Sequence, residues 1–263
     1  QRQMCIRDSA MGYARSVTDN HLSQTIMAVA EQKTSGSPAP DMVLWPENST
    51  DIDPVLDFES HQIVMGALAI SNRPILVGAV TDGPGKDERQ TTSMWWPPSS
   101  PQPTSTYHKR NLVPFGEWIP ARSFFLPLIP VLGNIGRQSV PGTTPGVLDA
   151  TIAGQKVPVG VVVCFEVAHD GTVADTVRHG AKILVVQSNN SSFIDTAQTP
   201  QQWQITRTRA VETGRHIVVS TTNSFSGLVN PDGSVAVRTN EGGHTHFTVT
   251  MPCLLYTSDA ADE

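Results

Sequence analysis

The sequence predicts a mixed α/β fold in which helices cover the outer faces of two β-sheets. Three observations support this prediction. Short apolar runs typical of strands alternate with amphipathic stretches of helical period. Clusters of Gly, Pro, Ser and Asn separate these segments, as turns do. Several expected strands follow one another without a helix between them, and such hairpins favour two sheets over one doubly wound parallel sheet.

The first half of the chain opens with an expected amphipathic helix over residues 20–33. Its apolar residues recur at helical spacing, and Thr18 or Asp19 is the expected N-cap. A turn cluster, TSGSPAP, ends this helix. The further elements expected here are strands at 42–45, 74–81 and 93–96, a helix at 59–70, and an extended segment at 105–109.

The second half contains most of the expected strands. They are at 147–152, 158–165, 183–187, 217–222, 227–229 and 235–238, with helices at 170–179 and 200–213. The string NPDG at 230–233 predicts the turn between the last two strands. These boundaries complete the expected sandwich.

The apolar segment 124–135, FFLPLIPVLGNI, is not assigned to a strand or a helix. It is shorter than the roughly 20 apolar residues that cross a bilayer, and it contains two prolines. Two interpretations remain open: a buried loop, or an arm that dips into a membrane interface. Tryptophans that could line a site beside it are Trp45, Trp95, Trp96 and Trp118, although buried aromatic residues near strands usually belong to the core.

The composition argues against nucleic acid as a partner. The chain of 263 residues has 18 Lys and Arg against 24 Asp and Glu, a net charge of -6. Nucleic-acid binding usually requires a basic surface, which this balance does not predict.

The two ends do not read as parts of a fold. QRQMCIRDS and CLLYTSDAADE back-translate into DNA strings that are largely reverse complements and resemble a sequencing adapter. We therefore expect residues 1–9 and 253–263 to be adapter-derived and not structural, and 10–252 to form one truncated domain. Cys5 and Cys253 lie in these ends, so Cys164 is the only cysteine of the domain. Because one cysteine cannot form an intramolecular disulfide or a cysteine-based metal cluster, we expect neither in this domain.

Three reactive side chains coincide with the ends of apolar, strand-like runs. Glu47 follows MVLWP, Lys109 follows STYH, and Cys164 ends the run that contains VGVVV. Each alone has an ordinary interpretation, as a solvated Glu, a surface Lys or a core Cys. If they converge, Cys164 can attack a carbonyl, Glu47 can move its proton, and Lys109 can stabilise an oxyanion.

The strings around these residues resemble a known superfamily. LWPENS, YHKRNLVPFGEWIP and CFE are similar to motifs of the nitrilase (carbon–nitrogen hydrolase) superfamily and its Glu-Lys-Cys triad. The middle string resembles the apolipoprotein N-acyltransferase branch, and the likeness covers nearly all of 41–235. It implies a nitrilase-type α-β-β-α sandwich that lacks its first strand. It also implies Glu47 as base, Lys109 as oxyanion stabiliser and Cys164 as nucleophile, with Glu117 and Glu166 as supporting carboxylates that orient Lys109 and the acceptor site.

The same resemblance implies a function. A fatty acyl group would move from a phospholipid, through a cysteine thioester, to the N-terminal amine of diacylglyceryl-cysteine in an apolipoprotein. The parent would lie in the bacterial inner membrane with this domain on its outer or periplasmic side and transmembrane helices upstream and downstream. No cofactor and no metal are implied. Phe165 stands where many members have Tyr, and Thr92-Ser93 where Asn-Ser is common, so two polar contacts are in question.

Three alternatives stay open from the sequence. A soluble nitrilase-type amidase would use the same triad with water as acceptor. A Cys-His hydrolase would use His169 or His216, and a binding domain would make Cys164 dispensable. A catalytic Cys164 is expected to react fast with a small electrophile near neutral pH, which would exclude the binding domain.

Overall fold

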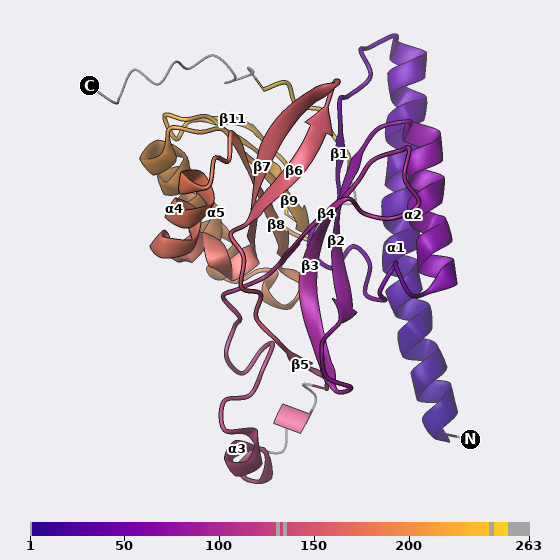
Figure 1. Cartoon of the computed structure of the whole chain (residues 1–263), viewed down its shortest axis with the longest axis vertical. Coiled ribbons are helices and arrows are strands. Elements are labelled where there is room, and N and C mark those ends of the chain that lie inside the picture. Colours follow the sequence, from indigo (N-terminus) through magenta and orange to yellow (C-terminus); the bar gives the residue numbers. More distant parts are fainter. Residues whose placement is uncertain (1, 130–131, 134–135, 242–244, 252–263) are drawn as a thin grey trace.

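The computed structural model describes residues 2–129, 132–133, 136–241 and 245–251, with side chains from Ser16 onward, Ser192 excepted. Two β-sheets lie face to face, and a pair of helices covers the outer face of each sheet (Figure 1). The predicted α-β-β-α sandwich is therefore confirmed. Residues 253–263 lie outside the described residues, so the expected domain boundaries stay predictions.

The first sheet has the strand order β1-β2-β3-β4, and β5 pairs with β3. Strand β1 runs parallel to β2, and the β2-β3 and β3-β4 pairs are antiparallel. Helices α1 and α2 cover this sheet (Figure 1). The bounds are β1 Val43–Leu44, β2 Ile75–Asp82, β3 Glu88–Trp96, β4 Ser105–His108, β5 Gln138–Ser139, α1 Arg2–Ser35 and α2 Phe58–Ser71.

The second sheet has the order β11-β10-β9-β8-β7-β6, with its three central strands, β7, β8 and β9, parallel. Helices α4 and α5 cover it on the side opposite α1 and α2 (Figure 1). The bounds are β6 Val147–Ile152, β7 Gln155–Val163, β8 Ile183–Asn189, β9 Ile217–Thr222, β10 Gly227–Val229, β11 Val235–Arg238, α4 Asp170–Arg178 and α5 Gln198–Thr213.

Most boundaries differ from the sequence prediction by a few residues, and three differences have a clear physical reason. Helix α1 does not begin at Thr18 or Asp19 but is already helical at Arg2, because no proline interrupts the stretch before them and a polar residue alone does not stop a helix. Strand β3 is longer than predicted, because its polar first half, which lacks an apolar run, still pairs with β2. Strand β7 ends at Val163, so Cys164 follows the strand and begins a 3-10 turn, Cys164–Ala168.

The space between the sheets is filled by apolar side chains from both. Trp95 and Tyr107 of the first sheet join Val159, Val161 and Val163 of the second in one fully buried cluster. One polar side chain crosses this layer. Gln187 of β8 accepts a hydrogen bond from the Ser93 hydroxyl at 2.5 Å and donates to the Trp45 carbonyl at 2.6 Å. These two hydrogen bonds hold the sheets in position relative to each other, near the ends of β1, β4, β7 and β8.

Candidate active site

Glu47 lies in the loop after β1, where Pro46 ends the strand. The approach of this loop to β2 requires glycine at position 78, since a Cβ there would lie 2.2 Å from the Pro46 carbonyl oxygen. Glu47 is buried, and its Oε2 accepts a hydrogen bond from the Asn189 N–H at 2.7 Å. Burial raises the pKa of the Glu47 carboxyl, although the Lys109 charge opposes the shift. This carboxyl therefore retains a proton more readily than an exposed one.

Lys109 follows β4 and is only 2% exposed. Its Nζ lies 3.1 Å from Glu47 Oε1 and 3.0 Å from Glu117 Oε1. The second carboxylate oxygen of Glu117 accepts from the Val113 N–H at 2.7 Å, which fixes the loop after Lys109. Burial opposes the charge, but Glu47, Cys164 and Glu117 together raise the pKa of Lys109. The ammonium group stays charged between two carboxylates.

Cys164 is half-buried and is the first residue of the turn after β7. Its backbone has φ 51°, in the left-handed region that non-glycine residues rarely adopt. Burial, followed by the charges of Glu47 and Glu117, raises the pKa of the thiol to about 12. The Lys109 charge opposes this shift, and the expected fast labelling of Cys164 near neutral pH stays a prediction.

Glu166 is fully buried two residues after Cys164. Its Oε1 accepts from the Tyr107 hydroxyl at 2.8 Å and from the N–H groups of Arg110 and Asn111 at 2.6 and 3.0 Å. Its Oε2 accepts from the Val163 N–H at 2.9 Å. This carboxylate ties the segment after Lys109 to the turn that carries Cys164.

Four of the five predicted site residues, Glu47, Lys109, Glu117 and Glu166, have buried polar partners in the structure. The two supporting carboxylates, however, have different partners. Glu117 contacts Lys109 through an ion pair, whereas Glu166 bonds backbone groups and a phenol. The fifth, Cys164, joins them at the end of β8, where Asn190 Oδ1 lies 3.9 Å from its sulfur and the neighbouring Asn189 N–H donates to Glu47. Such a site can accept a thiol proton on Glu47 and hold a developing negative charge near Lys109.

The histidines singled out in the sequence have no comparable arrangement. Within the described part of the chain, His169 Nε2 and His216 Nδ1 are buried without a hydrogen-bond partner. The His169 ring packs edge-to-face against Phe165 at 4.8 Å between centroids. The Cys-His alternative therefore has no supporting geometry.

Sequence reasoning missed the contribution of β8. Asn189 bonds Glu47, and the Asn190 Oδ1 lies 3.9 Å from the Cys164 sulfur. The signal was present, because the apolar run of β8 ends in the polar string QSNN at the same edge of the sheet as Cys164. Of the two departures from common members, the Thr92-Ser93 pair is hydrogen-bonded: Thr92 to Thr81 and His108, and Ser93 to Gln187. The other, Phe165, packs its ring against His169.

The segment after Glu117 projects from the sandwich as an arm. Its helix α3, Arg122–Leu128, has no buried residue and lies away from both sheets (Figure 1). Phe124 is 62% and Leu128 64% exposed. The buried-loop interpretation therefore does not hold for 124–129, whereas Leu132 is buried. Residues 130, 131, 134 and 135 lie outside the described residues. Of the four tryptophans, Trp45, Trp95 and Trp96 are core residues, and only Trp118 is partly exposed.

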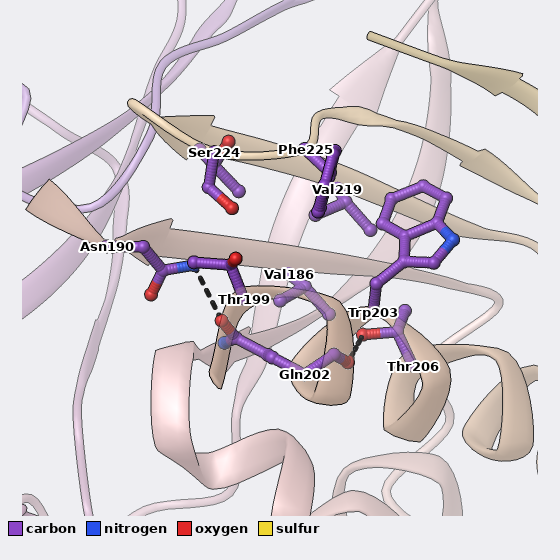
Figure 2. Close-up of a pocket in the computed structure, with 10 residues that line it drawn as sticks. Val186, Asn190, Thr199, Gln202, Trp203, Thr206, Val219, Ser224 and Phe225 are labelled. Carbon is purple, nitrogen blue, oxygen red and sulfur yellow. Dashed lines mark hydrogen bonds between the residues drawn. The ribbon is translucent and has the colours of Figure 1, made fainter. Parts of the chain in front are cut away.

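Two hollows among the described residues are not lined by Glu47, Lys109 or Cys164. A wide groove of about 1460 Å³ runs along α1 and the segment 245–251, and neither Lys109 nor Cys164 lines it. A second cavity of about 10 Å³ lies between β8, β9 and α5 (Figure 2). It has room for one water molecule at most and holds no substrate. No helix of the described residues is long and apolar enough to cross a bilayer.

Comparisons with known proteins agree with this architecture. The family described as carbon-nitrogen hydrolase matches residues 18–253. A protein of Mycolicibacterium smegmatis named apolipoprotein N-acyltransferase is 40% identical over 230 residues, which cover 86% of this chain and 37% of the relative. One of the same name from Bdellovibrio bacteriovorus is 31% identical, covering 75% of this chain and 38% of the relative. This chain therefore spans less than two fifths of the length of these relatives.

Solved structures of low sequence identity share the fold. An amidase of Nesterenkonia sp., with an acetamide moiety added covalently at its active-site cysteine, superposes with a TM-score of 0.61 at 16% identity, covering 86% of this chain and 82% of that chain. A branch 10 member of the nitrilase superfamily from Saccharomyces cerevisiae has a TM-score of 0.59 at 17% identity, covering 85% and 82%.

Proposed function

The chain belongs to the carbon–nitrogen hydrolase family, and we propose that it carries the catalytic centre of an N-acyltransferase. Glu47, Lys109 and Cys164 form its triad. The observation that carries the proposal is the buried Lys109 ammonium, held by Glu47 and Glu117 and close enough to Cys164 for the two charges to shift each other's pKa. That arrangement suits acyl transfer through a thioester.

In the first half-reaction Cys164 attacks the ester carbonyl of a phospholipid. The thiol gives its proton to Glu47 as the carbon–sulfur bond forms, which suits a thiol that is protonated at rest. Lys109 faces the negative oxygen of the tetrahedral intermediate. Glu47 returns the proton to the departing alkoxide, so a lysophospholipid leaves and a thioester remains on Cys164.

In the second half-reaction the N-terminal amine of a diacylglyceryl-cysteine in an apolipoprotein attacks the thioester. The amine loses a proton to Glu47 and forms the amide bond, and the carbon–sulfur bond breaks. The leaving sulfur recovers the proton from Glu47. Lys109 stabilises the oxyanion again, so one charged group serves both steps.

Glu117 and Glu166 support these steps in different ways. Glu117 balances the Lys109 charge and limits its position. Glu166 holds two backbone segments in position beside Cys164. It accepts hydrogen bonds from the Arg110 N–H, after Lys109, and from the Val163 N–H, before Cys164. No cofactor or metal takes part in the scheme.

The exposed arm supports a lipid rather than a small amide as acyl donor. Phe124, Leu128 and Ile129 are all more than 40% exposed, and aromatic and aliphatic side chains of this kind lower their free energy in a membrane interface. The names of the relatives from Mycolicibacterium and Bdellovibrio point the same way. We infer that the parent protein lies in the bacterial inner membrane with this domain on the outer or periplasmic side.

The direct test is mass spectrometry of the parent protein after incubation with phospholipid vesicles alone. A fatty-acyl mass on the peptide that contains Cys164, lost on addition of a diacylglyceryl lipopeptide amine, supports the transferase. Cys164→Ala must abolish the adduct. Hydrolysis of small amides without a lipid adduct would instead assign the chain to the amidases, whose structures share its fold.

A further inference from the structure

Two side-chain amides form a line from helix α5 to the thiol of Cys164. Asn190 Nδ2 donates to Gln202 Oε1 at 2.7 Å, and Asn190 Oδ1 lies 3.9 Å from the Cys164 sulfur, at the long end of the range for a thiol donor. Gln202 Nε2 in turn donates to the Ser188 hydroxyl at 2.9 Å. Figure 2 shows the hydrogen bond between Asn190 and Gln202, both of which line the small cavity.

The hydrogen bonds of Gln202 decide which atom of Asn190 faces the sulfur. An amide has one donor end and one acceptor end, so a Gln202 that donates to Ser188 can only accept from Asn190. Asn190 must then turn its NH2 group toward α5 and its oxygen toward Cys164. Since Asn190 is only 4% exposed, bulk water does not substitute for either contact.

The surroundings strengthen this line. The cavity beside it measures only about 10 Å³, and Thr199, Thr206, Trp203 and Val219, which line it, are all buried. A hydrogen bond in such dry surroundings is stronger than one exposed to water. The left-handed backbone of Cys164 further limits where the sulfur can lie.

We propose that Gln202 is a positioning residue that orients Asn190, and through it the Cys164 thiol. The inference rests on the proposed function, in which Cys164 is the nucleophile. At rest the S–H bond points to Asn190 Oδ1, which fixes the sulfur and favours the neutral thiol. When the acyl donor binds, rotation about Cβ–Sγ turns the S–H bond toward Glu47, which takes the proton as the sulfur attacks.

Raman spectroscopy of the S–H stretch tests this inference on the chain as it is. Subtracting the spectrum of the Cys164→Ala form of each protein isolates Cys164 from Cys5 and Cys253. We expect Asn190→Leu and Gln202→Leu to move the band to higher frequency, as for a thiol without an acceptor. Gln202→Glu retains an acceptor for Asn190 and should keep the wild-type band. Gln201→Leu, an exposed neighbour on α5, is the matched control and should change nothing.

The alkylation rate of Cys164 provides a second readout. A hydrogen bond to the neutral thiol raises its pKa, so its loss in Gln202→Leu should speed alkylation about two- to fivefold at mildly alkaline pH. Gln202→Glu should react at or below the wild-type rate, because it adds a negative charge. A loosened fold would instead speed alkylation without this rescue. Gln202→Met, of similar volume, replaces the Leu variant if the latter does not melt cooperatively.

An unchanged S–H band in Gln202→Leu or Gln202→Met overturns the inference, even if Asn190→Leu alters it. Failure of the proposed function has a different signature. There, Cys164→Ala would leave acyl loading of the parent intact, whatever the Raman bands show.

Discussion

Two carboxylate clusters flank Cys164 and are built on opposite principles. In the lysine cluster, Glu47 and Glu117 share the Lys109 ammonium. In the backbone cluster, Glu166 accepts three backbone N–H bonds and one from the Tyr107 hydroxyl. Both lie beside Cys164, the proposed nucleophile, and all their carboxylates are buried except Glu117, which is partly exposed.

The difference teaches how partners decide what a buried carboxylate does. A carboxylate paired with an ammonium beside a reactive group can take up or release a proton during the reaction, while the ammonium balances its charge. A carboxylate bonded to main-chain groups stabilises the fold, because its loss leaves several buried N–H donors without acceptors. The lysine cluster should therefore affect rate and the backbone cluster stability.

The largest expected effect is on the rate of acyl loading in Glu47→Gln. The amide cannot accept the thiol proton, so acyl loading of Cys164 in the parent should fall about a thousandfold. The melting temperature should also fall, because the amide leaves Lys109 paired with Glu117 alone and turns an NH2 group toward either the ammonium or the Asn189 N–H, so loading is measured well below it. Time-resolved mass spectrometry and a thermal melt measure the two effects. Normal loading in this variant would remove Glu47 from its proposed role.

Glu166→Gln should show the reverse pattern. An amide NH2 would face backbone donors in place of one oxygen, and the free energy of unfolding should fall by about 3 kcal/mol. Urea unfolding followed by circular dichroism measures it. The matched control is Glu212→Gln on α5, an exposed partner of Arg209, which should cost at most about 1 kcal/mol. Equal losses in the two variants would contradict the special position of Glu166.

The thiol itself links the lysine cluster to stability through pH. The pKa of Cys164 is about 12 in the folded chain, against 9.0 for an ordinary thiol. Above about pH 9 the unfolded chain releases this proton first, so the free energy of unfolding should fall by up to about 1.4 kcal/mol per pH unit. Cys164→Ala removes this loss. Relative to wild type, the variant should gain stability between about pH 9 and pH 11, measured by urea unfolding. A constant difference would disprove the shift.

The smallest effect on the folded chain is expected at the arm, which belongs to neither cluster. Phe124→Ser with Leu128→Ser should leave the melting temperature unchanged, because both side chains are more than 60% exposed. Binding to anionic phospholipid vesicles, measured by cosedimentation, should fall about tenfold or more. Val235→Ser, an exposed apolar position on β11, serves as control. Unchanged vesicle binding would assign the arm a role other than membrane contact.

Most strands and the positions of the triad residues were predictable, because they depend on short apolar runs and on the residues that follow them. The apolar runs predicted most strands, and Glu47, Lys109 and Cys164 were identified from their place at the ends of such runs. The separate roles of Glu117 and Glu166 were not predictable, because they depend on which groups the folded chain turns toward each oxygen. Asn190 and Gln202 were missed for the same reason, since they contact each other only once α5 packs on β8. The sequence left the arm and the buried loop both open for 124–135, because apolar sequence alone does not distinguish a buried segment from an exposed one.

The Gln187 bridge between the sheets has a consequence for how the chain folds. Glu47 and Lys109 follow strands of one sheet, and Cys164 follows a strand of the other, so the site does not exist until the two sheets dock. Until then, Cys164 is an ordinary reactive thiol with a pKa near 9. A pulse of alkylating reagent during refolding would therefore label chains whose sheets are still apart and spare those that have docked. Protection of Cys164 from alkylation therefore reports when the two sheets dock. Ser93→Ala, which removes the hydrogen bond from Ser93 to Gln187, should delay this protection.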